Sequence, residues 1–290
     1  MARTPKTDKI GFINVNKPSG VGSTNVVSRV KWLTGLPCGH MGTLDPLASG
    51  VLPVGVGNAT RLFDYFLQKT KIYIAEFTFG VTSDTLDSTG ELEEKGFVPT
   101  AEEIERALPR FKGEMAQIPP RYSAKSVGGK RGYDLARAGV EFELPPKQVR
   151  IDGVKLLGGV AEKPNAYRFE IECGGGTYIR SIARDLASDL GTFAVMSALE
   201  RTKSGFFEIG AATPFEGIDE GNVESLIIPT EAVLPFDTLE LYGVGKEKIF
   251  NGVSVKTDFA DGTYKIYRDG TFYGVAEVRE GKARVKTKLC

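Results

Sequence analysis

The segment from residue 38 to residue 50 brings together the only histidine of the chain, His40, and an isolated aspartate, Asp45. Asp45 has apolar neighbours, so its carboxylate would lose hydration unless a cation pairs with it, and such carboxylates are candidates for catalysis. Its place before Pro46 favours an extended, rigidly held backbone. An ionised carboxylate here can act as a nucleophile or a base. The alternative is that Asp45 caps a helix beginning at Leu47.

The scarcity of histidine and cysteine limits the metal sites and the acid–base catalysis that the chain can support. Cysteines at positions 38, 173 and 290 form no Cys-x-x-Cys pair, and one histidine gives no zinc-binding pattern. Acid–base chemistry must therefore rely mainly on Asp, Glu, Tyr or Lys. The three glycines at 174–176 lack the spacing of a phosphate-binding loop. Asp84 and Asp87 do not fit a calcium loop, so we expect an acidic surface turn there.

The net charge is zero, with 37 basic and 37 acidic residues, but the charges are unevenly distributed. The basic excess is six in residues 1–73, five in 110–137 and two in 237–290, and the acidic excess is seven in 74–109 and six in 138–236. Such blocks can build a basic face, which is the electrostatic footprint of a nucleic-acid partner. The alternative is a set of solvated surface loops.

Length and hydropathy indicate a globular protein and argue against a membrane or secreted one. A chain of 290 residues with 41% hydrophobic residues is typical of a globular protein with one large domain and a smaller one. The longest uncharged stretch, residues 46–60, is broken by proline and glycine and is shorter than the roughly 20 residues of a membrane helix. No signal-peptide pattern follows the basic amino terminus. We expect a cytoplasmic protein and a monomer.

The hydrophobic pattern indicates the elements that position these residues. A helix is expected from Ser23 or Thr24 as N-cap to Gly35. Alternation predicts strands over 71–79 and 167–173, and a helix with an apolar stripe follows the three glycines and ends at Gly191. Because there is no regular βαβ repeat, we predict an α+β fold in which helices flank a largely antiparallel mixed sheet.

The composition changes near Asp237. From there the chain shows short alternating strands separated by glycines, with turn signals at Asp261-Gly262 and Asp269-Gly270. We therefore predict a large domain over residues 1–236 and a small all-β domain over 237–290.

Six segments, in order, resemble the motifs of the bacterial tRNA pseudouridine synthases that modify the T-loop uridine, the TruB family. They are NKPSG (16–20), GHMGTLDPLASGVLPVGVGNATR (39–61), KIYIAEFTFGVTSDTLDSTGE (71–91), PPRYSAKSVGGKRGYDLARAG (119–139), CGGGTYIRSIARDL (173–186) and LERTKSGFF (199–207). The resemblance implies a pseudouridine synthase catalytic domain over 1–236, with an RNA-gripping insertion at about 110–140, and a PUA-like domain over 237–290.

The resemblance also implies a reaction. Uridine 55 of tRNA would be flipped out, its glycosidic bond cleaved in a step that Asp45 initiates, and C5 rejoined to C1′, with neither cofactor nor metal. Asp45 would act as a nucleophile or remove the C2′ proton, and the sequence leaves both open. Tyr73 would stack on the base and accept or relay the C5 proton, and Arg180 would pair with Asp45. Substrate contacts fall to Tyr73 and to His40, Tyr178, Leu199, Lys17 and Pro18, with His40 filling the space left by the flipped nucleotides.

The insertion carries basic residues interleaved with aromatic ones, which suits phosphate contacts and recognition of RNA shape. They are Arg121, Lys125, Lys130, Arg131 and Arg137, with Tyr122 and Tyr133. One departure from the family lies at Leu199-Glu200-Arg201-Thr202, where a second arginine is usual, and this puts a phosphate contact there in doubt.

Two other functions remain open from the sequence. One is an RNA-binding or RNA-folding factor for tRNA with incidental catalysis. The other is an aspartate-dependent hydrolase, which the basic insertion and the lack of a second positioned acid disfavour.

Overall fold

One sheet organises most of the chain. The computed structural model describes residues 6–123, 126–127, 130–131, 140, 142, 144–242 and 244–289. Within them the large sheet has the order β14-β1-β3-β12-β4-β11-β10-β7, with β2, β13 and β15 pairing beside it. Only β1 with β14 and β3 with β12 run parallel in this sheet. The predicted α+β fold with a largely antiparallel mixed sheet is confirmed.

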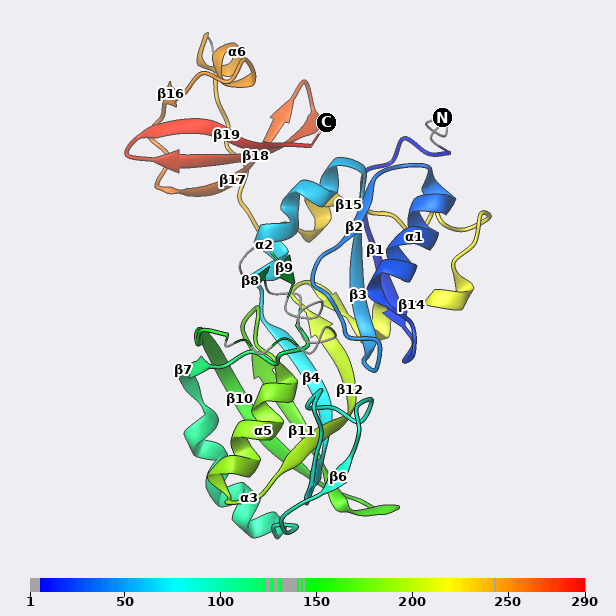
Figure 1. The fold of residues 1–290 in the computed structure, drawn as a ribbon. Helices are drawn as coiled ribbons and strands as arrows, with labels where there is room; N and C mark the ends of the chain where they lie inside the picture. The colour runs from blue at the N-terminus through cyan, green and yellow to red at the C-terminus, as the bar shows by residue number, and fades with distance from the viewer. Residues whose placement is uncertain are drawn as a thin grey trace.

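The strands of this sheet are β1 Gly11–Lys17, β2 Cys38–His40, β3 Ser49–Val56, β4 Lys71–Phe79, β7 Gly113–Gln117, β10 Lys147–Val160, β11 Lys163–Cys173, β12 Ala194–Ser204, β13 Phe207–Glu208, β14 Thr213–Pro214 and β15 Ile228–Pro229. Two short hairpins pair β5 Val81–Thr82 with β6 Glu93–Glu94 and β8 Ser126–Val127 with β9 Lys130–Arg131. The helices are α1 Ser23–Thr34, α2 Phe63–Leu67, α3 Ala101–Ala107, α5 Ile179–Asp189 and α6 Val244–Phe250, with 3-10 turns η1 Gly57–Leu62, η2 Leu108–Phe111, η3 Ile209–Ala211, η4 Phe215–Gly217 and η5 Thr230–Val233. Figure 1 shows α1 in one half of the sheet, beside β1 and β3, and α3 and α5 in the other half, where α3 contacts β10 and α5 contacts β4 and β12.

Helix α1 covers the predicted range but is capped differently. Its apolar residues Val26, Val30 and Leu33 are buried, and Gly35 ends it in the left-handed conformation with φ of 71°. The N-cap is Gly22, and no side chain caps the helix. The prediction of Ser23 or Thr24 as N-cap is wrong because the hydroxyl of Ser23 is bonded to Leu44 in a distant loop.

Strand β4 and helix α5 form the centre of the main core. Tyr73, Ala75, Phe77 and Phe79 alternate toward the interior as predicted. The apolar stripe of α5 packs against β4 and β12, and Ile182, Ala183 and Leu186 are fully buried. Glu76 is buried on the opposite face of β4, where it accepts from Lys163 and Ser197. The strand therefore places Tyr73 on the face that α5 covers.

The glycines before α5 serve close packing. A Cβ on Gly175 would lie 1.7 Å from the carbonyl oxygen of Leu67, and Gly176 has φ of 81°. Only glycine allows the two backbones to approach this closely. The run therefore sets the path of the chain into α5.

A separate antiparallel sheet forms the carboxyl-terminal end of the chain. It has the order β16-β19-β18-β17, built from Val255–Lys256, Lys282–Lys288, Thr271–Arg279 and Gly262–Arg268, and has a core of its own. Asp269 and Gly270 make the predicted tight turn, with φ of 50° and 79°. The turn prediction at Asp261-Gly262 is wrong, because Gly262 begins β17 and the second tight turn lies at Glu280-Gly281. Helix α6 precedes this sheet, and the sheet is consistent with a PUA-like domain.

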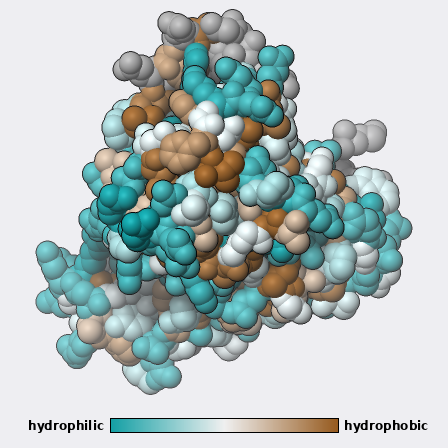
Figure 2. Space-filling view, turned by 90° about the horizontal axis from the view of Figure 1, so that it is seen from below, coloured by the Kyte–Doolittle hydropathy of each residue, from teal (hydrophilic) through white to brown (hydrophobic). Residues whose placement is uncertain are grey.

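Apolar side chains also reach the surface at the far end of the large sheet. Figure 2 views the molecule from below and shows hydrophobic patches between hydrophilic side chains. Phe97, Val98 and Phe193 are exposed. The hydroxyl of Thr192 bonds the main chain of Phe97, and the amide of Gly80 donates to the carbonyl of Phe193. None of the described helices is long and apolar enough to cross a membrane.

Lys71, at the start of β4, is a buried cation and predicts a pH-dependent stability. Its Nζ donates to the carbonyls of Phe66, Leu67 and Lys69, and burial lowers the pKa of Lys71 from 10.5 to about 8. Between pH 8 and pH 10.5 the lysine is protonated in the unfolded chain and neutral in the folded chain. The cost of burying its charge therefore falls as pH rises, and the folded state gains stability. We expect the unfolding free energy of the wild type, relative to Lys71→Met, to rise by about 2 kcal/mol from pH 7 to pH 9.5.

Urea unfolding of both proteins at the two pH values measures this difference. Taking the difference between the two proteins cancels the titration of the other groups. A difference that does not change with pH would contradict the lowered pKa of Lys71.

Candidate active site

Asp45 lies in a loop between two paired strands. The segment predicted to be a loop over residues 38–50 is shorter in the structure, because β2 includes His40 and β3 begins at Ser49. No helix begins at Leu47, and the carbonyl of Asp45 accepts from the amide of Ala48 in a turn. The alternative interpretation of Asp45 as a helix cap is therefore wrong. Its side chain is 39% exposed, so the carboxylate is open to a substrate.

The backbone on both sides of Asp45 is held by Ser23, the first residue of α1, and by the turn between β1 and α1. Ser23 donates from Oγ to the carbonyl of Leu44 at 2.7 Å and accepts from its amide at 2.9 Å. Ser19 donates to the carbonyl of Leu47 at 2.7 Å, and the amide of Gly20 donates to that of Pro46 at 2.8 Å. These bonds fix the loop independently of the Asp45 carboxylate. Such preorganisation is what a reactive group requires.

Lys17 also holds this loop, through hydrogen bonds from its ammonium group. It is fully buried at the end of β1, and its Nζ donates to the carbonyls of Pro18 at 2.9 Å, Val21 at 2.7 Å and Pro46 at 3.3 Å. Burial lowers the pKa of Lys17 to about 8, against the opposing effect of Asp45. Lys17 and Pro18 thus shape the turn under Asp45, and Lys17 itself is inaccessible to RNA.

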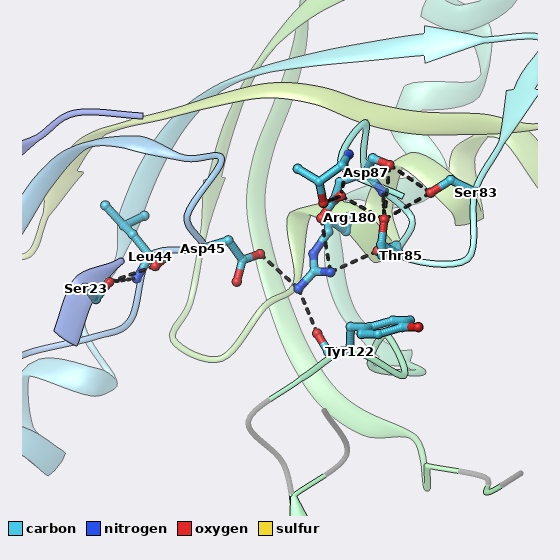
Figure 3. Close-up of polar contacts among 9 residues, drawn as sticks. Ser23, Leu44, Asp45, Ser83, Thr85, Asp87, Tyr122 and Arg180 are labelled. Carbon is cyan, nitrogen blue, oxygen red and sulfur yellow. Dashed lines mark hydrogen bonds and ion pairs between the residues drawn. The ribbon is translucent and has the colours of Figure 1, made fainter. Parts of the chain in front are cut away.

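Arg180, on the first turn of α5, forms the predicted pair with Asp45. Its Nη2 lies 2.9 Å from Oδ2 of Asp45 and donates to the carbonyl of Tyr122 at 2.9 Å. Its Nη1 donates to the carbonyl of Thr85 at 2.9 Å. The side chain is only 7% exposed, and Figure 3 shows the guanidinium between residues of three different segments. The planar guanidinium of arginine can bond several acceptors at once, as it does here.

Asp87 is a second carboxylate on the same guanidinium. Its Oδ2 lies 3.3 Å from Nη1 of Arg180, and its Oδ1 accepts from Thr85 and from the amide and hydroxyl of Thr89. Asp87 is buried, so the prediction of an acidic surface turn holds for Asp84 and is wrong for Asp87. Sequence reasoning missed this residue, although the hydroxyl residues on both sides of it were a signal.

Tyr73 and Leu199 come from neighbouring strands beside this network. Tyr73 of β4 pairs with Arg201 of β12, and Leu199 pairs with Ala75. Both predicted contact residues are largely buried. Burial raises the pKa of Tyr73 above its ordinary value, and the positive charge of Arg201 opposes this shift. The phenol therefore keeps its proton at neutral pH.

Tyr178 immediately precedes α5 and is fixed by Gln117. The amide of Tyr178 donates to Oε1 of Gln117 at 2.8 Å, and Nε2 of Gln117 donates back to the carbonyl of Tyr178 at 3.1 Å. Burial raises the pKa of the Tyr178 hydroxyl. Gln117 was not predicted, since its partner lies 61 residues away.

His40 lies at the end of β2, opposite Val54. Its Nδ1 is buried without a hydrogen-bond partner in the part of the chain that the structure describes. Burial lowers the pKa of His40 below 6.5, so the ring is neutral at pH 7. A neutral ring with an unpaired nitrogen suits stacking more than proton transfer.

The insertion joins the site through Tyr122, whose carbonyl accepts from Arg180. Arg121 is exposed, donates to the carbonyl of Val140 and lies over the ring of Phe142. Lys130 and Arg131 lie on β9. The predicted contact residues Lys125, Tyr133 and Arg137 lie outside the described residues.

Together these residues place an open carboxylate beside a buried cation and two aromatic rings. In the described part of the chain, no group of His, Cys, Asp and Glu side chains has the geometry to hold a metal ion. The acid that remains accessible is Asp45, because Asp87 is buried and fully bonded. The site suits attack by, or proton transfer to, a single carboxylate.

Comparisons with known proteins identify the family of the chain. The model of the TruB family pseudouridylate synthase N-terminal domain matches residues 31–179. The chain is 39% identical to tRNA pseudouridine synthase B of Caldanaerobacter subterraneus subsp. tengcongensis, over 95% of this chain and 98% of the relative. It is also 39% identical to the protein of that name from Acaryochloris marina, over 97% of this chain and 99% of the relative.

A solved structure entitled "Crystal Structure of a Cbf5-Nop10-Gar1 Complex" shares the fold, with a TM-score of 0.71 at 23% identity over 97% of this chain and 85% of that one. The family model covers half of the chain, and the relatives align along nearly all of it. The chain therefore belongs to the TruB family of pseudouridylate synthases.

Proposed function

We propose that this protein converts uridine 55, in the T-loop of tRNA, into pseudouridine. The observation that carries the proposal is the Asp45 carboxylate, 39% exposed and held 2.9 Å from the buried Arg180 on a loop whose backbone is bonded on both sides. The names of the relatives, tRNA pseudouridine synthase B, support the same substrate and reaction. They favour catalysis over a protein that only binds or folds RNA.

The reaction is an isomerisation, so the protein needs to supply position and charge. The glycosidic bond breaks, the uracil turns, and C5 joins C1′ while the C5 proton is lost and N1 gains one. Asp45 starts this sequence, either by attack on C1′ or by removal of the C2′ proton, and both require it to be ionised. The guanidinium of Arg180 stabilises that charge as water leaves the site.

The aromatic and basic residues serve recognition. Since Tyr73 is buried and keeps its proton, it suits stacking on the flipped base and relaying the C5 proton, with Tyr178 and Leu199 closing the pocket. The neutral ring of His40 fills the space that the flipped nucleotides leave. Arg121 and the insertion at about 110–140 contact phosphates of the T-stem-loop.

The domain boundaries, the oligomeric state and the location of the protein belong to the same proposal. The catalytic domain spans residues 1–236 and a PUA-like domain spans 237–290, which agrees with the separate core of the carboxyl-terminal sheet. The protein acts as a cytoplasmic monomer, without a cofactor.

Release of tritium from a tRNA transcript labelled at uridine C5 tests the function. We expect the wild-type protein to release one tritium per tRNA, and a transcript with cytidine at position 55 to release none. Continued release from the cytidine transcript would refute the T-loop assignment. No release from any transcript would refute the synthase activity itself.

A further inference from the structure

Arg201 is a buried cation that the proposed chemistry leaves unused. It lies on β12 and is 1% exposed, which excludes the phosphate contact considered for residues 199–202 as far as this side chain is concerned. Its Nε donates to the carbonyl of Val51 at 2.7 Å, and Nη2 and Nη1 reach those of Gly42 at 3.0 Å and Thr43 at 3.5 Å. Among the described residues its hydrogen-bond partners are these main-chain carbonyls and the Tyr73 side chain, and no carboxylate forms an ion pair with it.

A buried charge of this kind is costly, so its retention needs a reason. Burial of a guanidinium without a carboxylate costs several kcal/mol unless its donors are satisfied. Here the acceptors belong to the loop that leads to Asp45. Gly42 and Thr43 precede Asp45 by three and two residues, and Val51 is the third residue of β3, which follows the loop. One guanidinium therefore joins both ends of the loop.

The main chain of Arg201 is fixed as tightly as its side chain. It pairs in parallel with Gly50 of β3, and a Cβ on Gly50 would lie 2.3 Å from the carbonyl oxygen of Arg201. Gly50 has φ of +99° and Gly42 has φ of +136°, conformations that glycine adopts without strain. Arg201 thus has a defined place against the loop.

On its other side Arg201 is the cross-strand neighbour of Tyr73. The two residues pair on β12 and β4, and a bulge follows Arg201, between it and Lys203. Bulges beside active sites redirect side chains. The same positive charge acts on the Tyr73 phenol, as the opposing influence on its pKa indicates.

We propose that Arg201 is a positioning residue that couples the Asp45 loop to Tyr73, so that the carboxylate and the ring that stacks on the base keep a fixed separation. The proposal rests on the proposed function for its kinetic consequences. Its structural part concerns the loop alone and can be tested without RNA.

Two substitutions at Arg201 test the proposal. Arg201→Gln loses the charge, and Arg201→Lys keeps it but replaces the planar fork, whose three nitrogens each bond a different carbonyl of the loop, by a single ammonium nitrogen. We expect single-turnover tritium release to slow about 100-fold in Arg201→Gln, as for a displaced reactive group, and less in Arg201→Lys. The Kd for tRNA should stay within about threefold. Amide hydrogen exchange should accelerate in residues 41–45.

Lys71→Met is the matched control, because Lys71 is also a buried cation held by three carbonyls but bonds no residue of the loop. It should lose stability without faster exchange in residues 41–45 and without a slower reaction. Uniformly faster exchange in the Arg201 variants, or rates within threefold of the wild type, would overturn the proposal. If Arg201→Gln does not fold, Arg201→Lys decides by the same two measurements. If the wild type releases no tritium, the proposed function fails. The exchange rates of residues 41–45 still show whether Arg201 positions the loop.

Discussion

Asp45→Asn is expected to abolish pseudouridine formation, with a loss of about 10⁴-fold or more in the single-turnover rate. The amide is neutral, so it cannot attack C1′ or take the C2′ proton. Its oxygen can still accept from Arg180, and the loop is held by Ser23, Ser19 and Lys17. The fold and the affinity for tRNA should therefore change little.

Tritium release and tRNA binding, measured on the same preparation, separate chemistry from recognition. Asp84→Asn is the matched control, since Asp84 is an exposed aspartate outside the network, and its rate should equal that of the wild type. A rate for Asp45→Asn within a factor of 100 of the wild type would show that another group starts the reaction. A parallel loss of tRNA binding would show that Asp45 is chiefly a binding residue.

Local patterns predicted the elements that carry the site. Alternation located β4 with Tyr73 inward, and the apolar stripe located α5 with Arg180 on its first turn. The isolation of Asp45 among apolar residues correctly predicted a cationic partner. Each of these inferences uses residues close together in sequence, where periodicity and desolvation leave a visible signal.

Contacts between distant segments could not be predicted in the same way. Asp87 meets Arg180 across 93 positions, and Arg201 meets Gly42 across 159. The sequence pattern predicts Ser23 as an N-cap, yet its hydroxyl bonds Leu44 and the N-cap is Gly22. In each case a long-range partner overrides the local preference, and the choice of partner depends on strand order.

The structure shows that several basic residues of the positively charged segments are buried. The basic excess of residues 1–73 includes Lys17 and Lys71, both buried and bonded to carbonyls. Arg201 is buried in the same manner. Lys17 and Arg201 bond the loop that carries Asp45, and Lys71 bonds residues 66–69. None of these buried charges faces RNA. We therefore expect phosphate contacts to come from exposed basic residues such as Arg121.

Arg180→Met is expected to slow the reaction by about 10³-fold, the second large effect, because it leaves both Asp45 and Asp87 without their cation. Loss of one partner from a buried ion pair costs about 3–5 kcal/mol, some of it in stability. Arg180→Lys should recover little, since one ammonium cannot serve two carboxylates and the carbonyls of Thr85 and Tyr122. Single-turnover tritium release measures these rates. Arg184→Met, one turn later on α5, should stay near the wild-type rate.

A double-mutant cycle with Asp87→Asn shows how the loss arises. Asp87 and Arg180 form an ion pair through Nη1 of Arg180, so the effects of the two substitutions should not add. Asp87→Asn alone should slow the reaction about 10-fold to 100-fold, and in the Arg180→Met background it should change the rate by less than about threefold, because the guanidinium that Asp87 orients is gone. Additive effects would mean that Asp87 acts on the reaction by a route independent of Arg180. In that case the buried carboxylate would stabilise the turn around Thr85 and Thr89, and the catalytic network would consist of Asp45 and Arg180 alone.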